Sequence, residues 1–405
     1  MDSCPYVEDE KTPALNRSHA TKQTGDKQNR GRTTMKWKDI FLTWGALLLI
    51  TGCGKPVYIE TQQFLLVEGI DLDDDNKLVI YSSSPIFSRE AKERYKITTT
   101  TVDTVREAKK KLEAKINGNI ALGKLQSILI GKKMILQTNV LPYLDVFFRD
   151  PKNEINANVI VVDGSVKEVM DTNMNDKGQM GGVIKQLVES TYQGRISVLT
   201  TLQKFHQQMI DKAITPCITE LKVEKNDLVI SGSTLLHKDG TIADSLNNQE
   251  SSLLLLLQHN TSDPIPLTFH LPAEIFHTDE AISYVSINIR KAKTNILTKY
   301  EENHFLIDIQ LKVQIELTER MFNLDMEKQG KRLEQSIEEE LKKECETLIK
   351  KAQKHQIDPF GYGTYVRAHE YKDWMKIEDN WGKALSEATV NISPKVAIKS
   401  IGVSE

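Results

Sequence analysis

Apolar and polar positions after residue 60 alternate in blocks of strand and helix length. Phe64 to Val67 begins an apolar run that ends at Gly69-Ile70-Asp71, and after a polar turn a second run covers Leu78 to Tyr81. Two short apolar runs joined by a polar turn are typical of a β-hairpin. Val102 to Ile116 then has apolar residues three and four positions apart, which predicts one buried helix face, and Gly118 ends the run.

The same alternation continues to about residue 195. Ser127 to Ile130 has the pattern of a buried strand, Val140 to Phe148 that of a helix, and Asn158 to Val162 that of another strand. We therefore expect residues 53–195 to form an N-terminal mixed α/β domain. A helical connector is predicted to follow over residues 196–214.

A small strand-rich middle domain is predicted for residues 215–282. Its strands are expected at Ile218 to Val223 and at Leu228 to Ser231. Leu253 to Leu257 is an unbroken leucine run. Because a membrane-spanning helix needs roughly 20 apolar residues, we interpret this run as a core element.

Residues 283–405 are predicted to form a C-terminal α+β domain. Apolar residues alternate with polar ones from Ile307 to Ile315, which is the two-residue period of half-buried antiparallel strands. Gly330 to Gln356 has the apolar stripe of a long charged helix, and Val390 to Ile401 is expected to be the last strand. The predicted fold class is α+β, with three consecutive domains that each contain a mixed or antiparallel β-sheet and flanking helices.

One further apolar segment precedes these domains. Two lysines stand before the apolar run of Ile40 to Ile50, and Thr51-Gly52-Cys53 follows it. A positive region, a short apolar run and small residues occur in this order in secretory signal peptides. Ile-Thr-Gly-Cys also resembles the lipobox of bacterial lipoproteins. We expect residues 35–52 to be a lipoprotein signal peptide and Cys53 to carry the lipid.

Residues 1–34 are polar and have no apolar periodicity. Such a composition is typical of disordered segments. The segment is expected to be disordered or untranslated, so that translation begins at either Met1 or Met35.

Composition excludes several classes of function. The 405 residues carry a formal net charge of -3, and no cluster of basic residues alternates with aromatic ones as a nucleic-acid groove requires. The cysteines lie far apart and form no CxxC pair, so neither a disulfide framework nor a zinc site is predicted. They are Cys4, Cys53, Cys217 and Cys345.

Some short stretches match part of a cofactor-binding or metal-binding motif, but the residues and elements around them do not fit that motif. Gly118 to Lys124 fits most of a phosphate-binding loop, but Leu125 replaces the hydroxyl residue and the expected order of helix and strand is reversed. Asp71, Asp73 and Asp75 begin a calcium-loop pattern that lacks its later glycine and glutamate. The sequence contains no HExxH or GxSxG motif. We predict no catalytic residue, metal site or cofactor.

Asp358-Pro359-Phe360-Gly361-Tyr362-Gly363 is the least ordinary stretch after Cys53. Proline ends the preceding helix, glycine permits positive φ, and Phe360 is suited to the core. We interpret Asp358, Phe360, Gly361 and Gly363 as a structural loop, and docking of a partner is the alternative.

Together these features resemble the Ger(x)C family of spore germination lipoproteins, the C subunits of nutrient germinant receptors. The resemblance runs through Phe64 to Asp71, Gly123 to Gly131 and Phe148-Arg149-Asp150, and it is most specific at Asp358 to Gly363. One departure is Gly54-Lys-Pro-Val, where the family commonly has Trp-Asp after the lipid cysteine.

The resemblance implies a non-enzymatic subunit, anchored by lipid to the outer face of the spore inner membrane, beside the A and B membrane subunits of the receptor. It implies three domains, each a mixed sheet with helices. It leaves open which nutrient is sensed and whether this subunit binds a small molecule. The alternative is a solute-binding lipoprotein of a membrane importer, for which two similar lobes would be expected.

Overall fold

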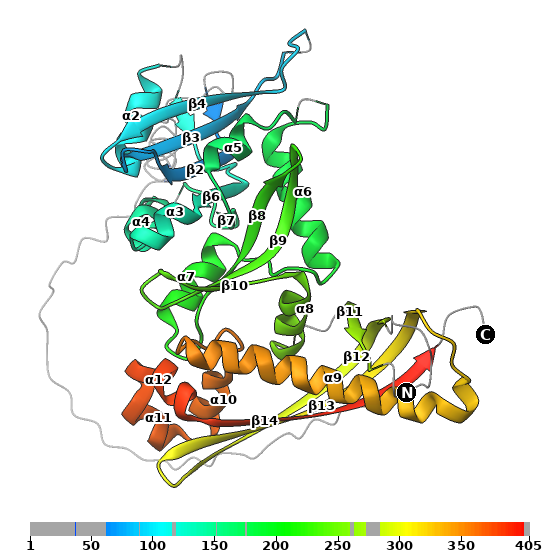
Figure 1. The fold of residues 1–405 in the computed structure, drawn as a ribbon. Coiled ribbons are helices and arrows are strands. Elements are labelled where there is room, and N and C mark those ends of the chain that lie inside the picture. Colours follow the sequence, from blue (N-terminus) through cyan, green and yellow to red (C-terminus); the bar gives the residue numbers. More distant parts are fainter. Residues whose placement is uncertain are drawn as a thin grey trace, which may run out of the picture. The chain divides into compact units, whose positions relative to one another are not determined.

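The structure is a computed structural model that describes Trp37 and residues 62–400, with gaps at 89, 116–118, 151, 175, 260–262 and 273–283. The chain divides into two units, Met1–Val57 and Tyr58–Glu405. Residues 1–34, Cys53 and the predicted signal peptide other than Trp37 lie outside the described residues. The folded elements described below all belong to the second unit (Figure 1).

An eight-stranded mixed sheet organises the first part of this unit (Figure 1). Its four central strands are mutually parallel, and antiparallel strands extend it on both sides. In spatial order the strands are β10 (Ile242–Leu246), β9 (Asp227–Leu236), β8 (Cys217–Glu224), β7 (Asn158–Val162), β6 (Ser127–Gly131), β2 (Val67–Leu72), β3 (Leu78–Pro85) and β4 (Tyr95–Val102).

Helices cover both faces of this sheet, because parallel strands need crossover connections that pass over a face. One apolar core lies under α2 (Val105–Glu113), α3 (Lys132–Gln137), α4 (Leu141–Arg149) and α7 (Leu202–Ile210). The core on the other face lies under α5 (Val166–Asp171) and α6 (Met180–Gln193). The strands β6 and β7 are buried along their whole length, as strands covered on both faces must be.

The predicted hairpin and the helices and strands after it are confirmed, with two differences. The strand expected from Phe64 is broken: β1 (Gln62–Phe64) pairs with β5 (Asn119–Ala121) in a separate two-stranded parallel sheet, and β2 begins at Val67. The chain changes partner here, since the Leu65 amide donates to Ala121 and the Leu66 amide donates to Ser83.

The second difference concerns residues 215–282, for which a sheet of their own was predicted. Instead, β8 pairs in parallel with β7, and β9 and β10 continue the same sheet. The β7 strand would otherwise be an unpaired edge, which proteins avoid. The leucine run forms the end of α8 (Asn248–Leu257), a helix that begins with a capping box between Asn247 and Glu250, and all five leucines are buried.

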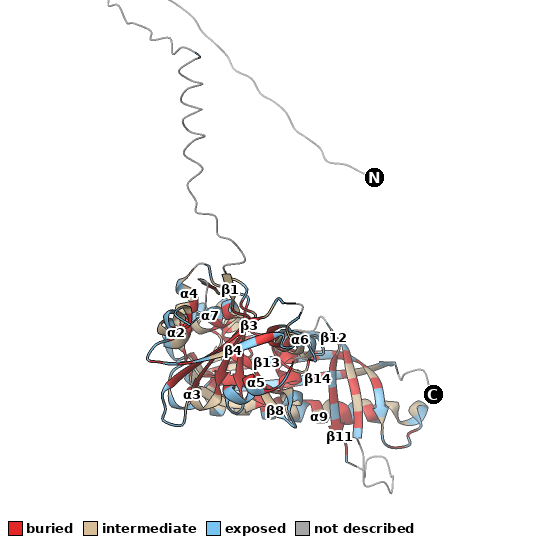
Figure 2. Ribbon diagram, turned by 90° about the horizontal axis from the view of Figure 1, so that it is seen from above, coloured by how far each residue is buried: buried red, intermediate tan, exposed pale blue. Residues whose placement is uncertain are grey.

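The last part of the chain forms a four-stranded sheet in the order β11 (Ile265–His270), β12 (Tyr284–Glu301), β13 (His304–Arg320) and β14 (Thr389–Ser400). The predicted alternation is confirmed, and Figure 2 shows it as alternating buried and exposed colours along β12 to β14. The strand β14 returns parallel to β13.

The parallel return requires a crossover, which contains five helices: α9 (Met326–Lys354), α10 (Tyr362–His369), α11 (Tyr371–Ile377), the short η4 (Glu378–Asn380) and α12 (Trp381–Glu387). The apolar stripe predicted for Gly330 to Gln356 is the buried face of α9, and Cys345 lies on this face. Cys217 and Cys345 are both buried, and neither forms a disulfide. The α+β class is therefore confirmed, although the three sheets do not correspond to one per predicted domain.

None of the helices in the described part of the chain combines the length and hydrophobicity that a membrane span requires.

Candidate functional site

The Asp358 to Gly363 loop joins α9 to α10. Backbone conformation requires glycine at one position, because Gly361 has φ +81° and residues with a Cβ rarely adopt that region. Gly361 is also the residue that precedes the first turn of α10. The first N–H groups of a helix lack partners within the helix and need acceptors from elsewhere.

Asp358 supplies those acceptors. Its side chain is fully buried, and the Gly361 amide donates to Oδ1 at 2.8 Å while the Gly363 amide donates to Oδ2 at 2.8 Å. The indole Nε1 of Trp381 also donates to Oδ2 at 2.8 Å. Burial raises the pKa of the Asp358 carboxyl above its ordinary value, and these N–H donors oppose the shift. The carboxyl group thus connects the start of α10 to the start of α12.

The loop backbone is tied to earlier parts of the chain. The Thr215 amide donates to the Asp358 carbonyl at 2.8 Å, and the Gln258 side chain donates to the Pro359 carbonyl at 2.7 Å. Gly363 lies so close to Ala213 that an added Cβ would be 2.7 Å from the Ala213 carbonyl oxygen. Close approach of two backbones therefore requires glycine at this position as well.

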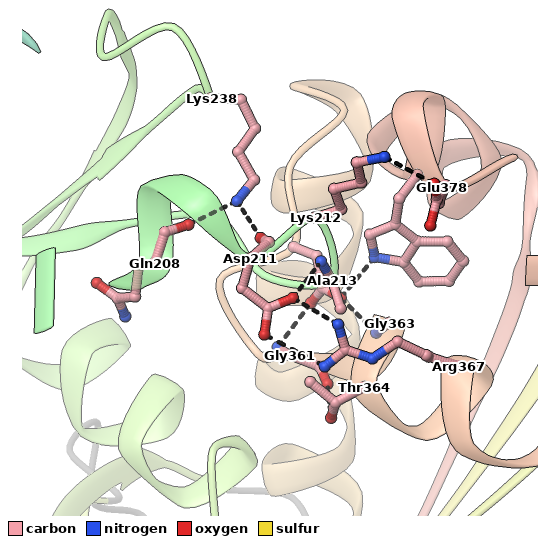
Figure 3. Close-up of polar contacts among 12 residues, drawn as sticks. Gln208, Asp211, Lys212, Ala213, Lys238, Gly361, Gly363, Thr364, Arg367 and Glu378 are labelled. Carbon is pink, nitrogen blue, oxygen red and sulfur yellow. Dashed lines mark hydrogen bonds and ion pairs between the residues drawn. The ribbon is translucent and has the colours of Figure 1, made fainter. Parts of the chain in front are cut away.

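Charged groups surround the loop on its more exposed side (Figure 3). Arg367 of α10 donates to both carboxylate oxygens of Asp211, at 2.8 and 3.2 Å. Desolvation raises the pKa of Asp211, but the bonds from Arg367 and the Ala213 amide outweigh it, so the pKa is lowered. On the other side of this segment, Lys212 forms an ion pair with Glu378 at 2.7 Å.

Lys238, in the turn between β9 and β10, completes the arrangement. Its ammonium donates to the carbonyl oxygens of Gln208, at 2.5 Å, and of Asp211 (Figure 3). Desolvation lowers the pKa of Lys238 to about 8, although Asp211 and Asp358 oppose the shift. The end of α7 is therefore held both by the β9–β10 turn and by α10.

Phe360 is 6% exposed and stacks on the buried Tyr362, with ring centroids 5.0 Å apart. The structure thus brings the four predicted loop residues together in the interior. Their partners Trp381 and Ala213 were not predicted, because they lie far from the loop in sequence. The nearby pair of Arg367 and Asp211 was not predicted either, because tertiary packing alone brings Asp211 to α10. An aspartate shortly before a helix is a capping signal that sequence analysis alone could have used for Asp358.

This arrangement is suited to holding elements together. Three N–H donors occupy the Asp358 carboxylate in the protein interior, where it cannot meet a substrate or act as a base. Among the described residues, no group of three or more His, Cys, Asp or Glu side chains is placed to hold a metal ion.

Two family sequence models match the chain. The model described as "Spore germination protein N-terminal domain" matches residues 55–223. The model described as "Spore germination B3/ GerAC like, C-terminal" matches residues 231–402, which include the Asp358 loop.

Known proteins match over nearly the same length. The chain is 24% identical over 375 residues to the spore germination protein GerQC of Bacillus cereus, covering 92% of this chain and 100% of that protein. It is 21% identical over 392 residues to the spore germination protein KC of Bacillus subtilis (strain 168), covering 88% of this chain and 94% of that protein.

The crystal structure of the GerBC protein has a similar fold, with a TM-score of 0.51, 17% sequence identity, and coverage of 82% of this chain and 96% of that one. The matches extend in order through both halves of the chain. The chain therefore belongs to the GerAC-like family of spore germination proteins.

Proposed function

We propose that this chain is the lipid-anchored, non-enzymatic C subunit of a nutrient germinant receptor, which works beside the A and B membrane subunits. The observation that carries the proposal is that both family models match in order, one over residues 55–223 and the other over 231–402. The geometry of the Asp358 loop, a structural junction, agrees with a protein that acts through its partners.

The two halves of the described chain also differ from each other. One is built on an eight-stranded mixed sheet and the other on a four-stranded sheet with a long parallel return. A solute-binding protein would be expected to have two similar lobes, so this difference supports the receptor subunit over the importer component.

Deletion of the gene tests the proposal. Spores without the protein should respond weakly or not at all to a particular set of nutrients, while a non-nutrient trigger should act normally. The readout is the fall in optical density of a spore suspension after each trigger. An unchanged response to every nutrient tested, in a strain without a second copy of the family, would refute the proposal.

We further propose that Cys53 carries a diacylglyceryl group that anchors the protein to the outer face of the spore inner membrane. Two acyl chains are needed for stable anchoring, since one gives only marginal membrane binding. Cys53→Ala should abolish metabolic labelling with palmitate and release the protein from the membrane fraction. Cys217→Ala is the matched control, because Cys217 lies in the folded part of the chain, and it should label normally. Labelling that persists in Cys53→Ala would exclude this anchor.

The Asp358 loop has a structural role in this proposal. Asp358 and Tyr362 are fully buried, so they are inaccessible to a partner protein in the folded state. Their contribution to germination would come through the stability of the junction between α7 and the helices after α9. A variant of Asp358 that germinates poorly with an unchanged melting temperature would instead support direct docking.

A further inference from the structure

Glu68 is a buried acid with no evident structural purpose. It lies on β2, between β3 and β6 in the eight-stranded sheet, and is 6% exposed. Its Oε2 atom is buried and has no hydrogen-bond partner among the described residues. Burying an unpaired carboxylate is unfavourable because the group loses its water without gaining donors. Desolvation accordingly raises the pKa of Glu68 to about 7, against the opposing charge of Lys109.

Glu68 lines a cavity of about 290 Å³ between the sheet and the helices α2 and α4. Much of the wall is apolar, formed by Val105, Leu122, Val146 and Phe147. An apolar cavity with a few polar groups directed to it is the usual form of a small-molecule site. Here the buried polar group is an acceptor that lacks a donor.

Of the remaining lining residues, Asn153 is a neutral amide and the others are charged. Arg106, Lys109 and Lys110 come from α2, and Glu113 and Asp150 also line the cavity. Arg106 and Lys110 are exposed and Lys109 is half-buried, so the cations lie toward solvent while Glu68 lies in the interior. The positive and negative charges around the cavity are balanced, three of each with Glu68 included.

We propose that this cavity binds a small zwitterion, a molecule of the α-amino acid class with a primary ammonium, a carboxylate and an apolar side chain. The ammonium would donate to Glu68, the carboxylate would meet the cations of α2, and the side chain would lie against the apolar wall. The inference goes beyond the proposed receptor role and does not depend on it.

The charge distribution argues against simpler ligands. Apart from Glu68, the lining carries three cations and two anions, Glu113 and Asp150, so its net charge is positive. A plain amine would gain the contact with Glu68 but would leave this positive charge without a counter-charge. A plain carboxylate would be attracted by the cations but would meet the Glu68 carboxylate inside. Only a molecule that carries both charges satisfies both ends of the cavity.

Equilibrium dialysis with the full chain in detergent tests the proposal at pH 7.5. The probes are radiolabelled L-alanine, L-valine, L-leucine and L-phenylalanine, each tested separately. For the probe that binds most tightly, the amine without the carboxylate and the acid without the amine serve as matched ligands; for leucine these are 3-methylbutylamine and 4-methylpentanoate. At least one amino acid should bind, and both matched ligands should bind at least tenfold more weakly, roughly the value of a charge-assisted hydrogen bond.

Two variants test whether the ligand binds in this cavity. Glu68→Gln keeps the size of the side chain but removes its charge, and it should weaken binding at least about tenfold. Lys109→Met should weaken binding by a smaller factor, because the lysine is partly solvated. Glu93→Gln is the control, since Glu93 is exposed and does not line the cavity, and this variant should bind as the unmodified chain does.

Several outcomes would overturn the proposal. They are failure of all four amino acids to bind, binding that Glu68→Gln leaves unchanged, and equal affinity for the matched amine. Because Glu68→Gln removes an unpaired buried charge, the variant is expected to be at least as stable as the unmodified chain, and a thermal melt of the same sample separates lost binding from unfolding.

Discussion

Asp358 and Glu68 are both carboxylic acids in the protein interior, but their surroundings are opposite. Asp358 accepts three hydrogen bonds of 2.8 Å, from two backbone amides and one indole. Glu68 has a buried oxygen without any hydrogen-bond partner among the described residues and lines a cavity. The Asp358 carboxylate therefore has hydrogen-bond donors on both oxygens, whereas the Glu68 carboxylate has a buried oxygen that lacks a donor.

The comparison separates two reasons for burying a charge. A buried carboxylate with its full set of donors fixes the geometry of the elements that supply them, and removing it leaves those donors without partners. A buried carboxylate without donors reduces stability, and such sites are where proteins commonly exchange stability for function. The predictions below test each half of this contrast.

The largest effect is expected from Asp358→Ala. The change leaves three buried N–H groups without an acceptor, those of Gly361, Gly363 and the Trp381 indole. We expect the free energy of unfolding to fall by about 4 kcal/mol, in the range for breaking a buried charged network. Denaturant unfolding measures this loss. Asp74→Ala is the control, because Asp74 is exposed and its loss should leave stability nearly unchanged. A loss below about 1 kcal/mol for Asp358→Ala would contradict the structural role of Asp358.

Gly363→Ala should have the next largest effect. The new Cβ would be 2.6 Å from the Trp381 Nε1 and 2.7 Å from the Ala213 carbonyl oxygen. We expect a loss of about 2 to 3 kcal/mol, because backbone atoms on the Ala213 side would have to move. Gly182→Ala in α6 is the matched control: nothing lies within 4 Å of its added Cβ, so stability should be unchanged or slightly higher. Equal effects at the two positions would show that close approach is not what requires Gly363.

Glu68→Gln should raise stability, and more so at higher pH. The folded-state pKa of Glu68, about 7, lies above the ordinary value of 4.5. The folded protein therefore holds a proton that the unfolded chain releases between these values, so stability falls as pH rises from 4.5 to 7. Glu68→Gln lacks this loss, so the difference in free energy of unfolding between the variant and the unmodified chain should grow by about 2 to 3 kcal/mol across that window. Thermal melts of both proteins at pH 4.5, 6 and 7.5 measure this difference. A difference that does not change with pH would show that the Glu68 carboxyl group titrates normally.

The smallest effect is expected at Lys238, near the Asp358 loop. Its folded-state pKa, about 8, lies below the ordinary 10.5, so the unfolded chain binds a proton that the folded protein lacks between these values. Stability should therefore rise with pH from 8 to 10.5, and Lys238→Met should remove that rise. After discounting for solvent we expect less than about 1 kcal/mol. The exposed Lys124, changed to methionine, should leave the pH profile unaltered.

Periodicity predicted most of the secondary structure. The strand β7 has the predicted ends Asn158 and Val162, and the stripe of α9 contains the buried residues expected for it. These signals are local, because the spacing of apolar residues close together in the sequence determines which face of a helix or strand is apolar. The order of strands in a sheet is not local, which is why β8 was predicted to begin a new sheet and instead extends the first one.

In the candidate sites, too, local features could be predicted from the sequence and long-range contacts could not. Asp358, Gly361 and Gly363 were identified because proline and glycine indicate an unusual backbone at that point. Their partners Trp381 and Ala213 could not be identified, since tertiary packing alone brings them to the loop. Glu68 carries a signal that was available, a charged residue inside an apolar strand, but sequence alone does not show whether such an acid finds a donor.

The central claim is that these two buried acids have opposite effects on stability, and one experiment tests it directly. Asp358→Asn and Glu68→Gln each replace an acid by its amide, so size is kept and one charge is lost in both. In Asp358→Asn the amide NH₂ must face at least one N–H donor, whichever way the group is turned.

Denaturant unfolding of the full chain at pH 7.5 should therefore show Asp358→Asn less stable than the unmodified protein by about 1 to 3 kcal/mol. In the same experiment Glu68→Gln should be more stable. A change of the same sign in both variants would contradict the account.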